Sequence, residues 1–427
     1  MKSTRIMSAG ISALMGLSLL AGCSSATNTS SAAASAANEG PITLTVWTPS
    51  EDQSADLGNW LDKELAAFQE AHPEWQIEFV KEVCPEGEVK DKLSKDAEAG
   101  ADVFILANDN IPTLIQNGAI ARLGGATLDQ INEQNSATTI NTVTVGDGVY
   151  GVPCAANTWF MFYDKRVFSA DDVKSLDTML EKGKVGFPLS NSWYIASFYA
   201  ANGCTLFGAD GLDETAGIDF GGDKAVAVTN YLVDLAANPN FVDSNGLSAS
   251  ALTEGTINCL FSGEWDYAAV VEAIGEENVG VACAPTYTLD GEEKQLKAFA
   301  GSKAIGVNAT SKNPQVAVAL AAFLGSTQAQ QDRYDLRKVS PVDKTIKIAD
   351  SEMVQAIADT YDHASIVQPL NNTMGQYWGP AQSMGEELVN GTVTHENAAE
   401  KTEAMNTTMN TAAEDGSNEH DNEYSCS

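Results

Sequence analysis

Residues 101–110 read Ala-Asp-Val-Phe-Ile-Leu-Ala-Asn-Asp-Asn, a mostly apolar run that ends in three short polar side chains. The apolar part has the length and composition of a buried β-strand. In open α/β sheets, ligands bind beyond the carboxyl ends of the strands. The stretch therefore predicts a strand that ends at a binding site, with Asn108, Asp109 and Asn110 as candidate contacts. Capping of the helix that follows is the alternative role for Asp109.

The sequence on both sides of this strand alternates between strand-like and helix-like patterns. Leu57, Trp60, Leu61, Leu65 and Phe68 recur at the spacing of one helix face. We predict strands at residues 42–47, 76–80 and 103–106, and helices at residues 56–72, 88–99 and 111–117. Such alternation predicts an α/β fold in which a mostly parallel sheet is flanked by helices.

Beyond residue 140 the pattern becomes more varied. Residues 143–153 have the pattern of a hairpin that leads into an extended segment. Further strands are predicted at residues 158–163, 258–261 and 304–307, and further helices at residues 192–201, 223–236, 314–324 and 380–389. The body of the chain has about 370 residues, a length that favours two domains.

The N-terminal residues have the pattern of a bacterial lipoprotein signal. Lys2 and Arg5 precede a short apolar run that ends in Leu-Ala-Gly-Cys at residues 20–23. The run is too short for a membrane-spanning helix. We therefore expect a signal peptide over residues 1–22 and lipidation of Cys23, whose thiol would take the diacylglycerol. The alternative is an ordinary secretory signal with a chance cysteine.

Two segments have too few apolar side chains to form a packed core. Residues 23–40 are mostly Ser, Ala, Thr and Asn, which predicts a flexible tether. Residues 411–427 are rich in acids and Asn and contain no Lys or Arg, which predicts a disordered acidic tail.

The chain is strongly acidic. Its formal net charge is −34, and it would be −36 without Lys2 and Arg5. This charge argues against nucleic acid as a partner, because the phosphates would be repelled. An anionic ligand would need a basic patch, which the sequence does not show. A neutral ligand fits this composition best.

Metal and enzymatic motifs are missing from the sequence. None of the seven cysteines forms a CxxC pair, and the four histidines lie far from them, so a metal site is not supported. An extracellular location permits disulfides among the cysteines other than Cys23, and buried free thiols are the alternative. We find no GxSxG motif and no Gly-rich phosphate loop. We therefore predict no catalytic residues and no cofactor.

Aromatic side chains stand where loops are expected to converge. Trp193, Tyr194, Trp265 and Trp378 have polar or glycine neighbours in such segments. Trp159 lies in an apolar strand and is expected to be a packing residue or the rim of a hinge. Flat aromatic rings cover the apolar faces of sugars, and carboxylates or amides bind sugar hydroxyls. The residues therefore predict a neutral oligosaccharide as ligand.

At these residues the chain resembles the family of extracellular solute-binding proteins that includes the maltose-binding proteins. The resemblance covers nearly all of residues 41–409, and the order and spacing of its pieces carry it. These pieces are residues 44–47, 101–109, 116–120, 150–153, 162–165, 200–203, 263–265 and 301–308. The resemblance implies a two-lobed periplasmic-binding-protein fold of type II, with a hinge near Pro153 and Gly301. It places the N-lobe at residues 41–153 and 301–347 and the C-lobe at residues 154–300 and 348–410.

The same resemblance implies a lipid-anchored receptor of an ABC sugar importer. Such a receptor closes on a neutral oligosaccharide, above all maltose or maltooligosaccharides, and delivers it to permease subunits, and we expect it to act as a monomer. Trp193, Trp265 and Trp378 match aromatic stacking positions, and Asp109 matches a cleft aspartate. The expected ligand-binding set is completed by Glu51, Asp52, Asn108, Asn110, Asn157, Asn191, Tyr194 and Gln382.

Several positions depart from the family pattern. Amides stand at residues 110, 157, 191 and 382, where the maltose-binding protein has charged side chains, and Leu106 replaces a cleft tryptophan. These changes keep an oligosaccharide as the expected ligand but leave the particular sugar open. Two other functions stay open as well: a glycoside-acting enzyme tethered at the surface, because carboxylates are abundant, and a receptor for a different small solute.

Overall fold

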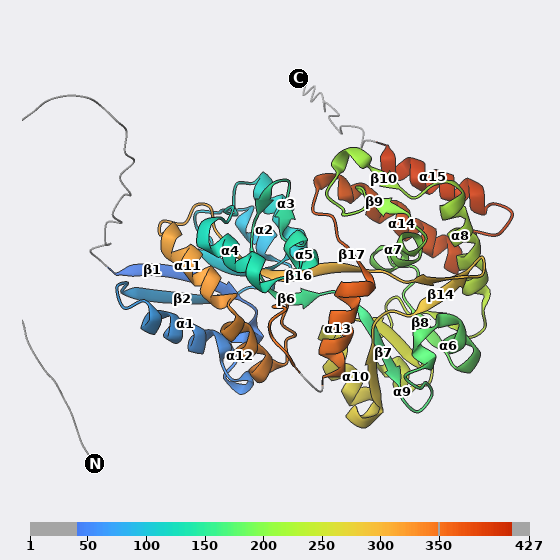
Figure 1. Ribbon diagram of the computed structural model, residues 1–427, viewed down its shortest axis with the longest axis horizontal. Helices are drawn as coiled ribbons and strands as arrows, with labels where there is room; N and C mark the ends of the chain where they lie inside the picture. The colour runs from blue at the N-terminus through green and yellow to red at the C-terminus, as the bar shows by residue number, and fades with distance from the viewer. Residues whose placement is uncertain (1–40, 349–350, 412–427) are drawn as a thin grey trace, which may run out of the picture. The chain divides into compact units, whose positions relative to one another are not determined.

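Two β-sheets organise the part of the chain that the computed structural model describes, residues 41–348 and 351–411 (Figure 1). The first sheet has the strand order β17-β16-β3-β1-β2, with β6 also paired to β16, and the second has the order β11-β8-β12-β7-β13. Helices flank both sheets, so the chain has a two-lobed α/β fold. We call the lobe around β1, β2 and β3 the N-lobe, and the lobe around β7, β8 and β12 the C-lobe.

The N-lobe contains the β-α alternation that the sequence predicts. Strand β1 pairs in parallel with both β2 and β3. The strands of this sheet are β1 (Ile42–Thr48), β2 (Ile77–Val83), β3 (Val103–Ala107), β6 (Val152–Asn157), β16 (Ala298–Val307) and β17 (Ser365–Val367), and β4 (Thr144–Val145) and β5 (Gly148–Val149) form a small hairpin. The helices are α1 (Trp60–Ala71), α2 (Val89–Leu93), α3 (Ile111–Gln116), α4 (Gly125–Gln134), α5 (Ala137–Asn141), α11 (Pro314–Leu324) and α12 (Thr327–Arg337).

The C-lobe is more helical. Its central sheet contains β7 (Phe160–Asp164), β8 (Val185–Phe187), β11 (Phe241–Asp243), β12 (Cys259–Ser262) and β13 (Val279–Ala282), with small pairs formed by β9 (Thr205–Leu206), β10 (Ile218–Asp219), β14 (Thr286–Leu289) and β15 (Glu292–Gln295). The helices are α6 (Leu176–Lys182), α7 (Ser192–Ala201), α8 (Gly222–Ala237), α9 (Ser250–Thr253), α10 (Tyr267–Ile274), α13 (Glu352–His363), α14 (Gly375–Val389) and α15 (Ala398–Asn410).

Each sheet also contains antiparallel pairs beside its parallel ones. Strand β16 runs antiparallel to β3 and β6, and β7 runs antiparallel to β12 and β13. A parallel neighbour needs a crossover of a dozen or more residues. Strand β6 of the first sheet and β7 of the second are separated by only two residues. The chain therefore passes directly from one sheet to the other, with no helix between them.

Three helices differ from their predicted bounds. Helix α1 begins at Trp60 rather than at residue 56, because Ala55–Leu57 form a separate short turn that ends at Gly58 in the left-handed conformation. Helix α2 ends at Leu93 rather than at residue 99, because Asp96 binds the backbone N–H of Ala99 and so favours a turn over the helix. Helix α14 begins at Gly375, before Pro380 instead of at it. Its start follows a turn in which Asn371 accepts a hydrogen bond from the N–H of Met374. Tyr377 and Trp378 therefore belong to the helix rather than preceding it.

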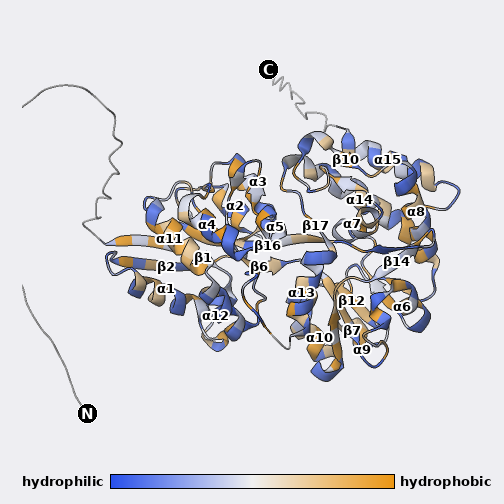
Figure 2. Cartoon of the chain, in the orientation of Figure 1, coloured by the Kyte–Doolittle hydropathy of each residue, from blue (hydrophilic) through white to orange (hydrophobic). Residues whose placement is uncertain are grey.

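Buried apolar side chains of the described residues form three clusters. One fills the N-lobe around β1, β3, α1 and α11, and the other two fill the C-lobe. Figure 2 shows hydrophobic residues along β1 and β7 and hydrophilic ones along α12. Trp60 and Trp159 are fully buried, as the sequence predicts. The exact lobe boundaries given above stay a prediction.

Strand β16 is the main connection between the lobes (Figure 1). Its first residues, 298–300, pair with β17, and its last residues, 303–307, pair with β3. The hydroxyl of Tyr361 donates to the carbonyl of Gly301 on β16 and accepts from the N–H of Asn157 on β6. One side chain of α13 thus holds both crossing strands, close to the predicted hinge.

The described cysteines are all free. Cys84, Cys154, Cys204 and Cys259 are buried, and Cys283 is partly buried. Burial raises the pKa of the Cys154 thiol to about 11, which keeps it protonated at neutral pH. Cys23 and Cys426, the signal peptide, the tether and residues 412–427 of the tail lie outside the described residues. Within the described ranges, no helix is both long and apolar enough to cross a bilayer.

Glu64 on α1 makes the stability of the N-lobe depend on pH. Its side chain is buried, and burial together with the neighbouring charge of Asp332 raises its pKa to about 7. The folded chain therefore binds more protons than the unfolded chain between about pH 4.5 and 7, so the free energy of unfolding falls as the pH rises through this window.

We expect Glu64→Gln to remove this dependence, since the amide stays neutral. Between pH 4.5 and 8, the free energy of unfolding of the variant should rise by roughly 3 kcal/mol relative to that of the wild type. This follows from about 1.36 kcal/mol for each unit by which the pKa is raised. Urea unfolding at a series of pH values measures it. If the difference in the free energy of unfolding between the two proteins does not change with pH, Glu64 is not the source of the pH dependence.

Candidate functional site

Three aromatic side chains meet on the C-lobe. The ring centroids of Trp193 and Trp265 lie 6.1 Å apart at an interplanar angle of 39°, and Trp193 meets Tyr194 edge-on at 5.3 Å. Trp265 is 49% exposed, the most exposed of the aromatic residues predicted for the site. Trp378 is partly buried and packs against Phe299 at 5.8 Å.

The start of α7 is held against α14, which explains how residues far apart in the sequence meet. The side chain of Asn191 accepts the N–H of Trp193 and so caps α7. Gln382 accepts the N–H of Ser192 at 3.1 Å, and Tyr377 donates to the carbonyl of Ser192 at 2.6 Å. Asn191 and Gln382 therefore lie beside the tryptophans, but part of their hydrogen-bonding capacity is used to position helices.

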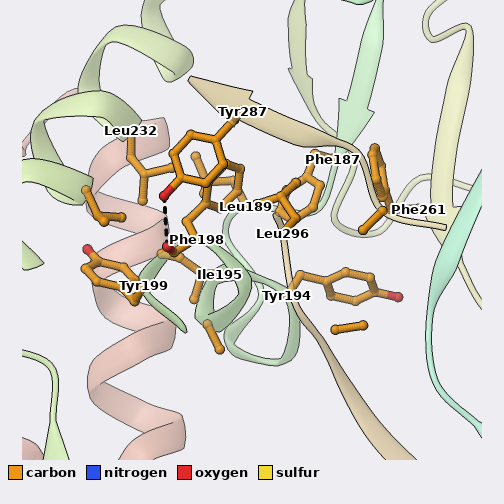
Figure 3. Close-up of a cluster of buried hydrophobic side chains, with 14 of the residues drawn as sticks. Phe187, Leu189, Tyr194, Ile195, Phe198, Tyr199, Leu232, Phe261, Tyr287 and Leu296 are labelled. Carbon is orange, nitrogen blue, oxygen red and sulfur yellow. Dashed lines mark hydrogen bonds between the residues drawn. The ribbon is translucent and has the colours of Figure 1, made fainter. Parts of the chain in front are cut away.

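Trp159 and Tyr194 form a base beneath the exposed rings. Trp159 is fully buried and stacks on Tyr194 at 5.3 Å with an interplanar angle of 29°. In Figure 3 the hydroxyl of Tyr194 points away from the core residues Phe198 and Leu232. Burial raises the pKa of the Tyr194 hydroxyl, so this group stays protonated and able to donate a hydrogen bond.

The N-lobe presents two exposed carboxylates at strand ends. Glu51 follows β1 and accepts from the hydroxyl of Ser50 at 3.0 Å. Asp109 follows β3 and accepts from the side chain of Asn110 at 3.1 Å. Each carboxylate retains acceptor capacity for sugar hydroxyls. Their place at the carboxyl ends of the strands is the one at which α/β sheets bind ligands.

Asp52 has a structural role, which corrects its prediction as a ligand contact. Its carboxylate is completely buried and accepts two hydrogen bonds from Arg333, at 2.9 and 2.7 Å. Arg337 binds the same carboxylate. Two guanidinium groups therefore occupy the acceptor sites of Asp52, and no surface is left for a ligand.

Asn108 and Asn110 are also buried, so these two predictions are corrected as well. The side chain of Asn108 accepts from the N–H of Ser302 and donates to the carbonyl of Thr142. The side chain of Asn110 accepts from the N–H of Lys90. Both amides are used to satisfy backbone groups next to the strand end, which is why a polar residue occurs in each position.

Asn157 remains a candidate contact. It is partly exposed at the end of β6, opposite Gly301 on β16. A side chain at residue 301 would collide with the backbone of Asn157 and with Asn108. The glycine thus lets the two crossing strands approach closely beside the site.

Sequence reasoning missed two residues beside the aromatic group, one bound to a ring and one next to it in the chain. Gln368 accepts the indole N–H of Trp193 at 3.0 Å, and nothing in its sequence context indicated this. Glu264 directly precedes Trp265 and accepts the backbone N–H of Ser340 at 2.9 Å. Burial raises the pKa of the Glu264 carboxyl above its usual range. From the Gly-Glu-Trp sequence at residues 263–265, only the tryptophan was predicted as a site residue.

The arrangement is suited to binding an uncharged molecule with both flat apolar faces and hydroxyl groups. Aromatic rings are presented by the C-lobe and carboxylates by the N-lobe. Within the described residues, no group of His, Cys, Asp and Glu side chains could hold a metal ion.

Comparisons with known proteins agree with this geometry. The family described as bacterial extracellular solute-binding protein matches residues 63–359. A structure solved with acarbose is 50% identical, with a TM-score of 0.79, covering 87% of this chain and 99% of the other. The maltodextrin-binding protein MalE1 from L. casei BL23, solved without ligand, is 24% identical, with a TM-score of 0.80. The match covers 88% of this chain and 100% of the other, and it supports the fold.

Two curated relatives are similar over most of their length. The maltooligosaccharide ABC transporter solute-binding lipoprotein of Streptococcus pneumoniae is 26% identical, covering 80% of this chain and 87% of the relative. The galactooligosaccharide-binding protein of Bacillus subtilis is 24% identical, covering 80% and 86%.

Alanine substitutions of Asp52 and Glu51 compare the effect of a buried, paired carboxylate on stability with that of an exposed one. Asp52→Ala leaves two buried or nearly buried arginines without their partner, so we expect a loss of roughly 3–5 kcal/mol in the free energy of unfolding. Glu51→Ala is the matched control and should change stability by less than about 0.5 kcal/mol. Chemical denaturation of both variants measures it. Equal stability of the two would contradict the structural role of Asp52.

Proposed function

We propose that this chain, which belongs to the family of bacterial extracellular solute-binding proteins, captures a neutral maltooligosaccharide and delivers it to the permease of an ABC transporter. The observation that carries the proposal is the pair of adjacent indoles formed by the partly buried Trp193 and the exposed Trp265. Adjacent rings of this kind suit successive sugar units, because each covers the apolar face of one unit.

The relatives support the choice of ligand class. The 50% identical structure was solved with acarbose, and the pneumococcal relative is named for maltooligosaccharides. The relative from Bacillus subtilis is named for galactooligosaccharides, so the linkage has to be determined by experiment. The net charge of −34 also favours an uncharged ligand.

Capture would proceed by closure of the two lobes about β6, β16 and the segment that follows α12. Exposed carboxylates on the N-lobe and aromatic rings on the C-lobe would then approach the sugar from opposite sides. Such closure hides the ligand from water and creates the shape that a permease can recognise. In this role the protein acts as a monomer and as a binding protein, without chemical turnover.

A ligand screen by isothermal titration calorimetry tests the function. Maltotetraose, a galactooligosaccharide, cellotetraose and glucose should be titrated, and we expect maltotetraose to bind most tightly. Chromatography of the recovered sugar should show it unchanged. Preference for the galactooligosaccharide would replace the proposed ligand, and shortened products would replace the binding function with an enzymatic one.

Trp265→Ala should weaken maltotetraose binding roughly tenfold to hundredfold, which corresponds to about 1–3 kcal/mol for a large buried apolar group. The melting temperature should hardly change, because the side chain is half exposed and leaves no core cavity. Trp378→Ala is a less clean test, since Trp378 packs on Phe299 and its loss should lower stability as well. If Trp265→Ala has a much lower melting temperature but binds maltotetraose normally, Trp265 is a packing residue.

Anchoring through Cys23 is the second part of the proposal. It is supported by the Leu-Ala-Gly-Cys sequence at residues 20–23 and by the name of the pneumococcal relative, which is a lipoprotein. In a bacterial host, Cys23→Ala should move the protein from the membrane fraction to the medium or periplasm, while Cys84→Ala should not. Retention of Cys23→Ala in membranes would contradict lipidation at this residue.

A further inference from the structure

The three tryptophans of the site are each connected to a segment that crosses between the lobes. Trp378 packs against Phe299, which lies on β16. Trp193 donates its indole N–H to Gln368, whose own backbone N–H donates to the carbonyl of Ala300 on β16 at 3.0 Å. The rings of the C-lobe are therefore joined to the strand about which closure would occur.

The most exposed ring, Trp265, is connected through Glu264. The Glu264 carboxylate accepts the N–H of Ser340, a fully buried residue in the segment that follows α12. The carbonyl of Ser340 accepts the N–H of Ala156 on β6 at 3.3 Å. One continuous path of hydrogen bonds thus runs from the loop that carries Trp265 to the second crossing strand.

Gly263 determines where the Trp265 ring can lie. The backbone of Gly263 has an ordinary extended conformation, with φ of −104°. A Cβ atom placed there would stand only 2.1 Å from the indole ring of Trp265. The ring therefore lies directly over the glycine, and any side chain at residue 263 would displace it.

We propose that Glu264 is a positioning residue, which, with Gly263, holds the Trp265 ring against Trp193 and couples this pair to the interlobe segment at Ser340. This inference rests on the proposed function. In that function Trp265 would contact the sugar, and Glu264 would connect it to the segment near the hinge. Trp265 needs such support because half of its surface is exposed and its own packing is slight. Gln368 holds Trp193 in a similar way, by accepting its indole N–H.

Four variants test the proposal. Glu264→Ala removes the acceptor of the Ser340 N–H, and Glu264→Gln keeps an oxygen in its place. Gly263→Ala leaves the hydrogen bond but displaces the indole. Glu352→Ala is the matched control, because Glu352 also accepts a backbone N–H, that of Val281 at 3.3 Å, and has no contact with the tryptophans among the described interactions.

We expect Glu264→Ala and Gly263→Ala to weaken maltotetraose binding about tenfold, the scale of one charge-assisted hydrogen bond or one misplaced ring. Glu264→Gln should restore the affinity to within about threefold of the wild type, because the amide oxygen can still accept the Ser340 N–H. Glu352→Ala should bind like the wild type. Wild-type affinity for Glu264→Ala, or equal losses for Glu264→Gln and Glu264→Ala, would overturn the proposal.

A second measurement needs no ligand. Two indoles in close contact couple in the near-ultraviolet circular dichroism spectrum, so Glu264→Ala and Gly263→Ala should reduce this signal and Glu352→Ala should not. Melting curves show whether each variant is folded. If the wild type binds none of the sugars, the proposed function fails, and the dichroism still decides whether Glu264 positions Trp265. An unchanged dichroism spectrum in Glu264→Ala overturns that role regardless of ligand.

Discussion

The hydrogen bonds of strand β16 are the constraint on which the rest of the structure depends. One end of this strand pairs with β17 and the other with β3 and β6. A single strand that pairs with β17 at one end and with the N-lobe strands at the other limits relative movement of the lobes to a change of backbone angles near its middle. The irregular register between Lys303 and Ala304 lies at this place, and β-bulges are common where a strand bends or ends its pairing.

Charged side chains next to the crossing strands are paired rather than presented to a ligand. Lys303 on β16 pairs with Glu86, and Asp52 pairs with Arg333 and Arg337 behind the end of β1. Arg333 also lies 5.2 Å from the ring of Trp60. Buried ion pairs contribute little net stability but make the loss of one partner costly. They fix α12 against the strands and leave Glu51 and Asp109 as the exposed acids that follow β1 and β3.

The aromatic surface has a layered construction. Trp159 and Tyr194 lie below, Trp193 and Trp265 lie above, and polar side chains from α14 and from Gln368, the residue after β17, hold the edges. A rigid base of this kind lowers the entropy cost of ordering the rings when a sugar binds.

The sequence by itself determined the class of protein. The alternation of residues 42–117 predicted the α/β fold, and the aromatic residues near predicted loops indicated the sugar-binding surface, because both signals are local in the chain. Only the tertiary structure decided the roles of the polar residues. Asp52, Asn108 and Asn110 follow strands just as Glu51 and Asp109 do, and their types are equally suited to a ligand. Their partners Arg333, Ser302 and Lys90 lie elsewhere in the sequence, so burial and pairing, which distinguish a structural amide or acid from a ligand contact, appear only after the chain has folded.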